Sequence, residues 1–182
     1  MIALHKNPPV VYPPDRTVRD LTGEWRVAHT RSRHEKALAA DLQTWNVSYF
    51  LPMVRRTLVI RGRRFHGMFP LFPGYLFFAG DAEDRYRALT TSHVANVIEV
   101  VDQARLIDEL SQIEMALANP SGLDPFPFLQ KGKRCRIARG PLAGIQGVVV
   151  QRDGITKLVL QIEMLGQAVA TEIDPSMLEP DD

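Results

Sequence analysis

Four side chains in the first half of the chain are of the types that carry acid–base or metal chemistry: His29, His34, Glu35 and His66. A zinc hydrolase places its ligands at set spacings, such as the two histidines of the pattern HExxH, and this pattern is absent from the chain. His34 and Glu35 are adjacent, so on a helix they would point in different directions. Because no paired carboxylates at a catalytic spacing occur either, we expect no enzyme activity, no catalytic residue, no metal and no cofactor. Metal-dependent turnover would reopen the question.

Arginine is concentrated in the segment RRTLVIRGRRFHGMF, where five arginines fall within ten residues. Two β-prone arms, Thr57 to Ile60 and Arg64 to Phe69, flank a short Arg-Gly-Arg stretch. Gly62 within it can supply the positive φ of a tight hairpin turn. So many guanidinium groups cannot lie in a core. The hairpin is either a solvated loop or a finger that contacts phosphates through Arg61, Arg63 and Arg64.

The net charge of +1 hides a segregation of charge along the chain. Residues 25–80 carry nine Lys or Arg against two acids, whereas residues 81–130 carry three against nine, and the two flanks each sum to zero. A protein polarised in this way can turn one side toward a polyanion. A single cysteine, Cys135, rules out an internal disulfide, and its alternating surroundings predict a buried strand position. No apolar run reaches the roughly 20 residues of a membrane span, and we expect a cytoplasmic protein without membrane association.

The stretch FPLFPGYLFF, residues 69–78, is the densest apolar run of the chain, with five aromatic residues where the whole chain has 8%. Pro70 and Pro73 cannot donate to a β ladder, so a strand is expected only from Gly74 onward. Phe72 and Tyr75 then flank a rigid Pro-Gly corner. A fixed corner that bears rings presents apolar surface at a low ordering cost, as a protein-binding patch requires. For Leu76, Phe77 and Phe78 taken alone, an ordinary core strand is the favoured interpretation.

Residues 24–118 have the periodicities of an antiparallel sheet flanked by helices. The prolines of residues 1–23 indicate an extension without a core of its own, which can still dock on the domain, and Asn46 is a plausible end for the first helix. Strands are expected at Trp25 to Ala28, Val47 to Val54, from Gly74 and at Val94 to Val101, and helices at Glu35 to Trp45, Ala82 to Leu89 and Ala104 to Ala118.

The composition changes after residue 118. Residues 119–130 hold three prolines and a glycine and are the best linker candidate. Residues 131–182 alternate apolar and polar side chains, with breaks at 140–144, 152–154 and 165–166. Four or five short strands in such a length predict a small β-barrel. The expected fold class is therefore α+β, an N-terminal sheet-and-helix domain followed by an SH3-like barrel.

Two motifs at this spacing resemble the NusG family of transcription elongation factors. PLFPGYLFF resembles the family's most recognisable motif, and its PLFP start is similar to the RfaH-type paralogues. Residues 24–118 resemble the family's N-terminal domain. Residues 131–182, with GKRCRIARGPLAGIQGVV, resemble its KOW domain, a match that would be weak alone because ribosomal proteins share it.

The resemblance implies a factor that rides on RNA polymerase, bound to the clamp helices of the largest subunit near upstream or non-template DNA. By binding the elongating state of the polymerase preferentially, such a factor disfavours the backtracked and hairpin-opened states of the polymerase, and it catalyses nothing itself. We expect a monomer. By matched position, the clamp contact comprises Phe72, Pro73, Tyr75, Phe77 and His29, and the nucleic-acid contact comprises Arg31, Arg33, Arg61, Arg63 and Arg64.

The sequence departs from the family in three places. Asp41, Thr44 and Trp45 stand where RfaH-type factors read bases, so no recruiting DNA element can be inferred. The KOW partner loop, Leu165, Gly166 and Gln167, lacks the large aromatic and the arginine by which general NusG proteins contact a ribosomal protein or Rho, and coupling to either stays open. The β-branched residues Val148 to Val150 favour a constitutive barrel over a tail that refolds to helices.

Three interpretations of function remain. A specialised antiterminator of the RfaH type is favoured by the PLFP start and the altered KOW loop, and a general NusG-type elongation factor is the second. The third is a KOW-type RNA-binding or ribosome-associated module. It predicts a basic barrel, whereas residues 131–182 are neutral overall.

Overall fold

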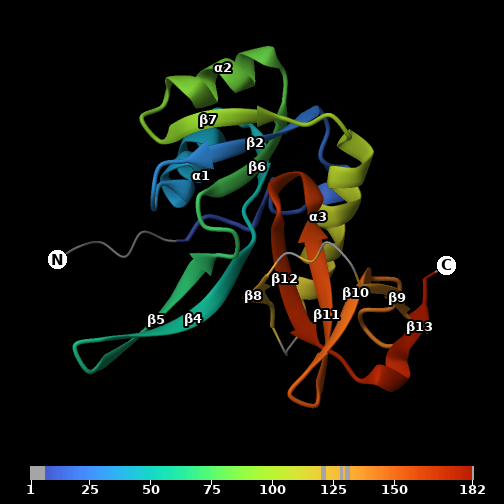
Figure 1. Ribbon diagram of the computed structural model, residues 1–182. Coiled ribbons are helices and arrows are strands. Elements are labelled where there is room, and N and C mark those ends of the chain that lie inside the picture. Colours follow the sequence, from blue (N-terminus) through green and yellow to red (C-terminus); the bar gives the residue numbers. More distant parts are fainter. Residues whose placement is uncertain (1–6, 120–121, 128, 130–131, 182) are drawn as a thin grey trace. The chain divides into compact units, whose positions relative to one another are not determined.

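The computed structural model describes residues 7–119, 122–127, 129 and 132–181 (Figure 1). The chain divides into two compact units, residues 1–103 and 104–182. The first is a mixed sheet-and-helix unit and the second is mainly β structure, which confirms the α+β class expected from the sequence.

The first unit is built on a five-stranded sheet in the order β1-β3-β6-β2-β7, in which every neighbouring pair is antiparallel. A separate two-stranded ribbon, β4-β5, leaves this sheet (Figure 1). The elements are β1 Val11–Tyr12, η1 Val18–Asp20, β2 Glu24–Thr30, α1 Glu35–Thr44, β3 Ser48–Phe50, β4 Met53–Ile60, β5 Arg63–Pro70, β6 Tyr75–Gly80, α2 Ala82–Thr90 and β7 Val94–Glu99.

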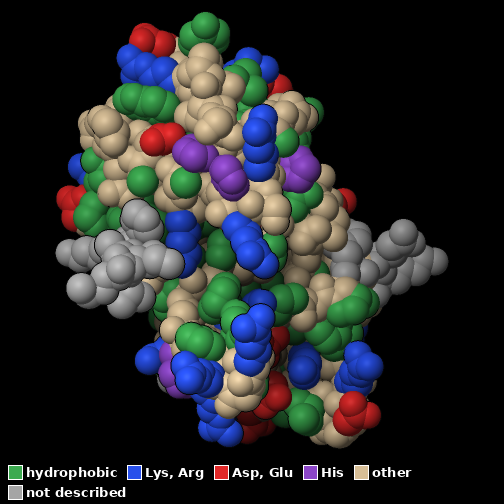
Figure 2. Space-filling model, turned by 90° about the vertical axis from the view of Figure 1, so that its left-hand side faces the viewer, with side chains coloured by type: hydrophobic (Ala, Val, Ile, Leu, Met, Phe, Trp, Pro, Cys, Tyr) green, Lys and Arg blue, Asp and Glu red, His purple; other side chains and the backbone are tan. Residues whose placement is uncertain are grey.

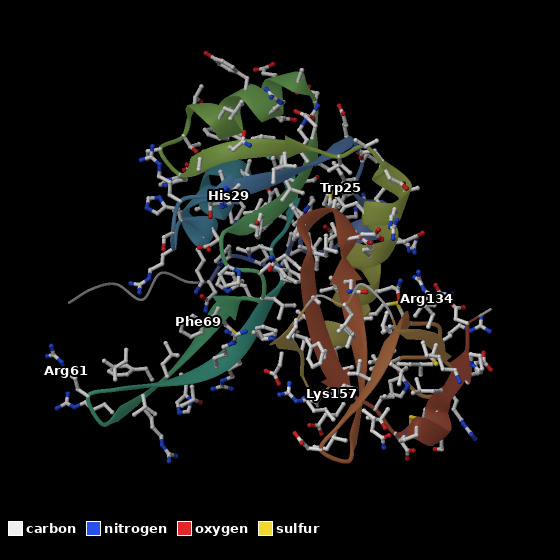
Figure 3. All side chains as sticks on the ribbon, in the orientation of Figure 1. Trp25, His29, Arg61, Phe69, Arg134 and Lys157 are labelled. Atoms are coloured by element: carbon white, nitrogen blue, oxygen red, sulfur yellow. The ribbon has the colours of Figure 1, made fainter. Side chains whose placement is uncertain are left out.

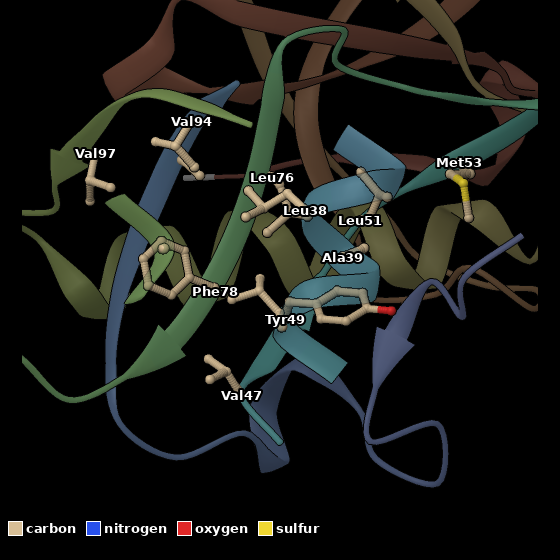
Figure 4. Packing of buried hydrophobic residues seen from close by; sticks show 13 residues of the cluster. Leu38, Ala39, Val47, Tyr49, Leu51, Met53, Leu76, Phe78, Val94 and Val97 are labelled. Atoms are coloured by element: carbon tan, nitrogen blue, oxygen red, sulfur yellow. The ribbon is translucent and has the colours of Figure 1, made fainter. Parts of the chain in front are cut away.

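The hydrophobic core of the first unit lies between one face of the sheet and α1 with α2 (Figure 4). The sheet contributes alternate residues, such as Leu76 and Phe78 of β6, because successive side chains of a strand point to opposite faces. Helix α1 contributes Leu38, Ala39 and Leu42, spaced so that they share one helical face. All five are 0% exposed.

Local signals in the sequence explain where the two helices of the first unit end and begin, and Asn46 acts as expected. Asn46 adopts the left-handed conformation (φ 56°) directly after Trp45, the C-cap of α1, and stops the helix. Helix α2 begins at a capping box, in which Asp81 accepts from the Asp84 backbone N–H at 2.9 Å while Asp84 accepts from the Asp81 N–H at 3.1 Å. These hydrogen bonds lower the pKa of the Asp81 carboxyl, with the Asp84 backbone N–H as the main cause.

The second unit is a six-stranded antiparallel sheet in the order β13-β9-β10-β11-β12-β8, together with helix α3. Helix α3 is tied to the sheet because the Gln112 side chain accepts from the Gln146 backbone N–H at 2.6 Å. The elements are α3 Gln103–Leu117, β8 Asp124–Phe126, β9 Lys133–Ile137, β10 Gln146–Arg152, β11 Ile155–Ile162, η2 Glu163–Leu165, β12 Gln167–Glu172, η3 Pro175–Met177 and β13 Leu178–Pro180.

Two local details differ from the sequence-based expectation, and a third possibility that the sequence left open is realised by the N-terminal extension. The predicted strand Val47 to Val54 is two strands, because the buried Pro52 cannot donate to a ladder and separates β3 from β4. The N-terminal extension docks, since Val11 pairs with Phe50. The expected linker carries β8, which pairs with β12, although residues 120–121, 128 and 130 lie outside the described residues.

Within the described residues, no helix is long and apolar enough to cross a membrane. The division of the chain into two compact units falls at the start of α3, whereas the sequence predicts a first domain that ends after this helix. The boundaries at residues 24, 119 and 131 stay predictions.

Truncation of Leu38 tests whether the face between α1 and the sheet is the main core of the first unit. We expect Leu38→Ala to lower the free energy of unfolding by about 2–5 kcal/mol, because the side chain is fully buried and leaves a cavity. Ala40→Ser, at an exposed position of the same helix, should cost less than about 0.5 kcal/mol. Urea denaturation followed by circular dichroism measures both, and equal losses would contradict this assignment of the core.

Candidate functional site

The FPGY corner, residues 72–75, connects the ribbon to β6 and is held by backbone hydrogen bonds on both sides. The Tyr75 N–H donates to the Phe72 carbonyl at 3.1 Å, and the Thr30 N–H of β2 donates to the Gly74 carbonyl at 2.8 Å. Gly74 has φ 86°, a conformation that favours glycine. The corner is therefore fixed to the end of the sheet.

Glu35, the first residue of α1, anchors the corner from the other side. Its carboxylate accepts a hydrogen bond from the Gly74 N–H at 2.6 Å, and the residue is only 5% exposed. A buried carboxylate is stable only with partners, and a charge-assisted bond of this kind is stronger than a neutral one. The sequence had suggested Glu35 only as an unsupported acid–base candidate, because nothing local to it shows that Gly74 is its partner.

The aromatic side chains of the corner divide into an exposed group and a buried group. His29 and Tyr75 face each other across β2 and β6, with ring centroids 5.3 Å apart and nearly parallel planes, and His29 is exposed while Tyr75 is half-buried. Pro73 is exposed. Figure 3 marks His29 at this end of the sheet.

Phe72 and Phe77 are buried, at 2% and 0% exposure, which corrects the expectation that these two predicted clamp residues present accessible surface. Phe77 lies two residues further along β6 than Tyr75, on the same face but inside the sheet. The Phe72 ring meets the Phe77 ring edge-on, with centroids 6.2 Å apart. The two phenylalanines thus support the corner from within, and its accessible groups are His29, Pro73 and Tyr75.

A cluster of histidines and basic side chains surrounds the exposed end of β2. Arg31 and Arg33 are exposed, and Arg33 has φ 65°. His34 and His93 share a hydrogen bond between their Nδ1 atoms at 2.8 Å, and His93 Nε2 lies 3.4 Å from an Asp41 carboxylate oxygen. Figure 2 shows histidine and Lys or Arg side chains on one face.

The ribbon β4-β5 carries the second group of predicted site residues. Its turn is formed by Arg61 and Gly62, with φ 49° and 76°, so the hairpin predicted from the sequence is confirmed. Arg61, Arg63 and Arg64 are all exposed, and Figure 3 shows Arg61 at the tip. These three arginines therefore lie at the tip of the ribbon and not at the FPGY corner, whereas Arg31 directly follows Thr30, which bonds to Gly74 of the corner.

Lys36 connects the root of the ribbon to α1. Its ammonium group donates to the Met68 carbonyl at 2.6 Å and to the Asn7 side chain at 2.7 Å, and it lies 6.0 Å from the centre of the Phe69 ring. Desolvation by the surrounding atoms lowers the pKa of Lys36. Lys36 thus stabilises the root of the ribbon, although the sequence analysis counted its charge as part of the basic surface.

Arg26 also has a structural role and is not part of the exposed basic surface. It is 5% exposed and forms ion pairs with Glu24 at 2.5 Å and Glu99 at 3.2 Å. Arg85 pairs with Glu99 as well, at 2.5 Å, and its hydrogen bond is the main cause that lowers the pKa of Glu99. The positive charge available to a partner is therefore smaller than the count over residues 25–80 suggests.

The predicted partner loop of the second unit is a short turn between β11 and β12. Leu165 ends η2, Gly166 adopts the left-handed conformation (φ 59°) and Gln167 begins β12. Leu165 and Gln167 are half-buried, and Gly166 is exposed. The break predicted at Leu165-Gly166 is confirmed, whereas its role as a binding loop stays a prediction.

Among the described residues, no group of three or more His, Cys, Asp or Glu side chains is arranged to hold a metal ion. Cys135 is a free, buried cysteine in β9, as its alternating surroundings predicted.

Comparison with known proteins identifies the family. The family model described as "Transcription termination factor nusG" matches residues 23–117, just over half of the chain. The chain belongs to the NusG family. A comparison with proteins of curated function found no match.

One solved structure similar to the chain is titled "Domain interaction in Thermotoga maritima NusG". Its sequence is 16% identical, the match covers 87% of this chain and 97% of that chain, and the TM-score is 0.47. The family match spans β2 to α3, so the FPGY corner and the ribbon both lie inside the matched region. The protein is thus a transcription factor of the elongation-factor kind, in a family that acts on RNA polymerase and is not catalytic.

Removal of the Glu35 carboxylate tests the anchoring of the corner. We expect Glu35→Ala to increase the exchange rate of the Gly74 amide, because the buried N–H loses its partner, with a local cost of about 1–3 kcal/mol. Glu35→Gln should have a smaller effect, since its amide oxygen can still accept. Hydrogen exchange followed by NMR measures the protection. Glu83→Ala, at an exposed position of α2, is the control, and an unchanged Gly74 amide in Glu35→Ala would refute the anchor.

Proposed function

We propose that the protein is a transcription elongation and antitermination factor that binds the clamp helices of the largest subunit of RNA polymerase through its FPGY corner. The observation that carries this is the stacked pair of His29 and Tyr75, accessible at the end of the sheet beside Pro73. Glu35 and the buried Phe72 hold this surface in place before a partner arrives. A preorganised aromatic surface loses little side-chain entropy on binding, and rings of this kind are frequent hot spots of interfaces.

The arginines supply the second contact. Arg31 and Arg33 beside the corner, and Arg61, Arg63 and Arg64 on the ribbon, are exposed and suit the phosphates of upstream or non-template DNA. A factor that holds both the clamp and the DNA stabilises the elongating state of the polymerase relative to paused or terminating states. The size of this stabilisation is set by the difference between the factor's affinity for the elongating state and its affinity for the paused or terminating states.

Within the family we propose a specialised, RfaH-like antiterminator. The PLFP start of the corner and the residues Leu165 and Gln167 in the KOW partner loop favour this assignment over a general NusG-type factor. The KOW unit would then act as a constitutive barrel, and the protein would work as a cytoplasmic monomer. Binding of the barrel to a ribosomal protein or Rho would favour the general factor.

Loss of polymerase binding tests the clamp contact. We expect Tyr75→Ala to weaken binding to RNA polymerase by about 10-fold or more, because it removes one ring of the stacked pair. Phe72→Ala is unsuitable alone, since Phe72 is buried and its truncation threatens the fold. Co-purification and fluorescence anisotropy with purified polymerase measure the effect. Tyr86→Ala removes a tyrosine that is 67% exposed on α2 and should leave binding unchanged; equal losses in both variants would reject the corner as the contact.

The salt dependence of DNA binding tests the ribbon arginines. Each phosphate contact contributes about −0.9 to the slope of log K against log salt concentration. Replacing Arg61, Arg63 and Arg64 by alanine should therefore make the slope less steep by up to about 3 units. A matched variant with the same loss of charge, Lys133→Ala with Arg134→Ala and Arg152→Ala in the second unit, should keep the wild-type slope. An identical slope in wild type and the ribbon variant would make the hairpin a solvated loop.

A further inference from the structure

Two histidines of the first unit share a hydrogen bond that the proposed contacts do not use. His34 precedes α1 and His93 lies between α2 and β7, yet their Nδ1 atoms are 2.8 Å apart. The ring centroids are 5.0 Å apart, close to the largest separation that this Nδ1–Nδ1 distance allows, so both nitrogens lie nearly on the line between the rings. A single proton therefore lies between them, donated by one ring and accepted by the other.

Backbone hydrogen bonds connect this pair to the segment that carries two exposed arginines. The Arg31 N–H donates to the His93 carbonyl at 2.9 Å, and the His34 N–H donates to the Arg31 carbonyl at 3.1 Å. The bond between the two imidazoles closes a ring with these contacts. Arg33 lies in the turn within this ring and has φ 65°, a conformation that a residue other than glycine keeps only where its surroundings impose it. The pair thus helps to hold both arginines in place.

The same pair influences the FPGY corner through α1. His34 is the N-cap of α1, and its carbonyl accepts from the Leu38 N–H at 2.9 Å. The next residue is Glu35, whose carboxylate binds the Gly74 N–H of the corner. A movement of His34 therefore displaces the start of α1, and with it the anchor of the corner.

One charged group faces the pair directly. The Asp41 carboxylate of α1 lies 3.4 Å from His93 Nε2, so a charged His93 has an ion-pair partner on the side away from His34. The other charged side chains of α1 are bound elsewhere, Glu35 to the corner and Lys36 to the root of the ribbon.

The ionisable groups of the other adjoining elements are paired, stacked or exposed. Helix α2 forms ion pairs within itself, and its Arg85 pairs with Glu99 of β7. Arg31 and Arg33 are exposed, and His29 of β2 stacks on a ring of the corner. The charge of the two imidazoles themselves therefore decides whether their bond forms.

Three protonation states of the pair differ in this respect. When both rings are neutral, one Nδ1–H donates to the other Nδ1, and when one ring is charged the same bond is charge-assisted and stronger. When both rings are charged, both Nδ1 atoms are donors and two like charges face each other, so the bond is lost.

We propose that His34 and His93 form a proton-gated latch that holds Arg31, Arg33 and the start of α1 in the geometry of the binding surface while at least one ring is neutral. The latch opens when both rings are charged, in the acidic part of the range of about pH 5 to 8 over which histidine changes charge. The two histidines are positioning residues. Their effect on polymerase binding rests on the function proposed above, whereas their coupled titration does not.

The ring titrations of the full-length protein test the latch itself. NMR of the histidine side chains follows the charge of each ring between about pH 8 and 5. We expect His34 and His93 to titrate together in two steps, because the shared proton couples them. In His93→Asn, the His34 ring should titrate in a single step. Independent single-step curves for both rings of the wild type would overturn the proposal.

Hydrogen exchange tests whether the latch holds its surroundings. With each rate expressed relative to an unstructured peptide at the same pH, we expect the protection of the Arg31 and His34 amides to fall by about 10-fold between about pH 7.5 and 5. His93→Asn keeps an uncharged donor and acceptor near the position of Nδ1, so its protection should not change with pH. His66→Asn, which removes a histidine on the ribbon, is the matched control and should behave like wild type. Equal losses in wild type and His93→Asn would contradict the latch.

Binding to purified RNA polymerase connects the latch to the proposed function. From about pH 7.5 to 6, the affinity of the wild type should fall about threefold more than that of His93→Asn, because the fraction with a closed latch decreases. His29 of the corner titrates in both proteins, so its effect cancels. The same pH dependence in both proteins would refute the positioning role. If neither protein binds polymerase, the proposed function fails, while a two-step titration of the rings still supports the latch.

Discussion

The hydrogen bond from the Gly74 N–H to the Glu35 carboxylate is the constraint on which the corner depends. It joins the first turn of α1 to the turn before β6, two segments 39 residues apart in the sequence. Without it, the Gly74 N–H would lose its partner, and the corner would be held only by its backbone hydrogen bonds to Thr30 and within the turn. The buried Phe72 and Phe77 supply the apolar support beneath the same turn.

The two candidate binding surfaces of the first unit, the FPGY corner and the β4-β5 ribbon, are attached to the fold in different ways. The corner is part of the main sheet, with hydrogen bonds to β2 and α1. The ribbon is a sheet of only two strands, and such an element is marginally stable alone. The Leu71 N–H, which donates to the Pro52 carbonyl at 2.8 Å, and the ammonium group of Lys36 fasten its root. Hydrogen bonds to β2 and α1 therefore fix the corner directly, whereas the tip of the ribbon is held only through its root.

Much of this fold could be predicted from the sequence because its signals are local. The helical spacing around Leu38, the stop at Asn46 and the turn at Gly62 each depend on a few neighbouring residues, and all three were correct. Partners far apart in the chain could not be foreseen. The burial of Arg26 depends on Glu99, and the strand in the expected linker depends on β12. Of the site, the sequence located the corner and the arginines but not which of its rings are accessible, because that depends on where β6 enters the core.

The two-residue turn of the ribbon has a consequence for register. The outer half of the ribbon is exposed on both faces, so no buried side chain favours one alignment of its strands over another. The alignment is set by the turn at Arg61 and Gly62 and by the fastened root. A shift of one strand by a single residue would move its side chains to the opposite face, and Phe65 would no longer lie opposite Leu58. The length of the turn thus determines which side chains the ribbon presents on each of its faces.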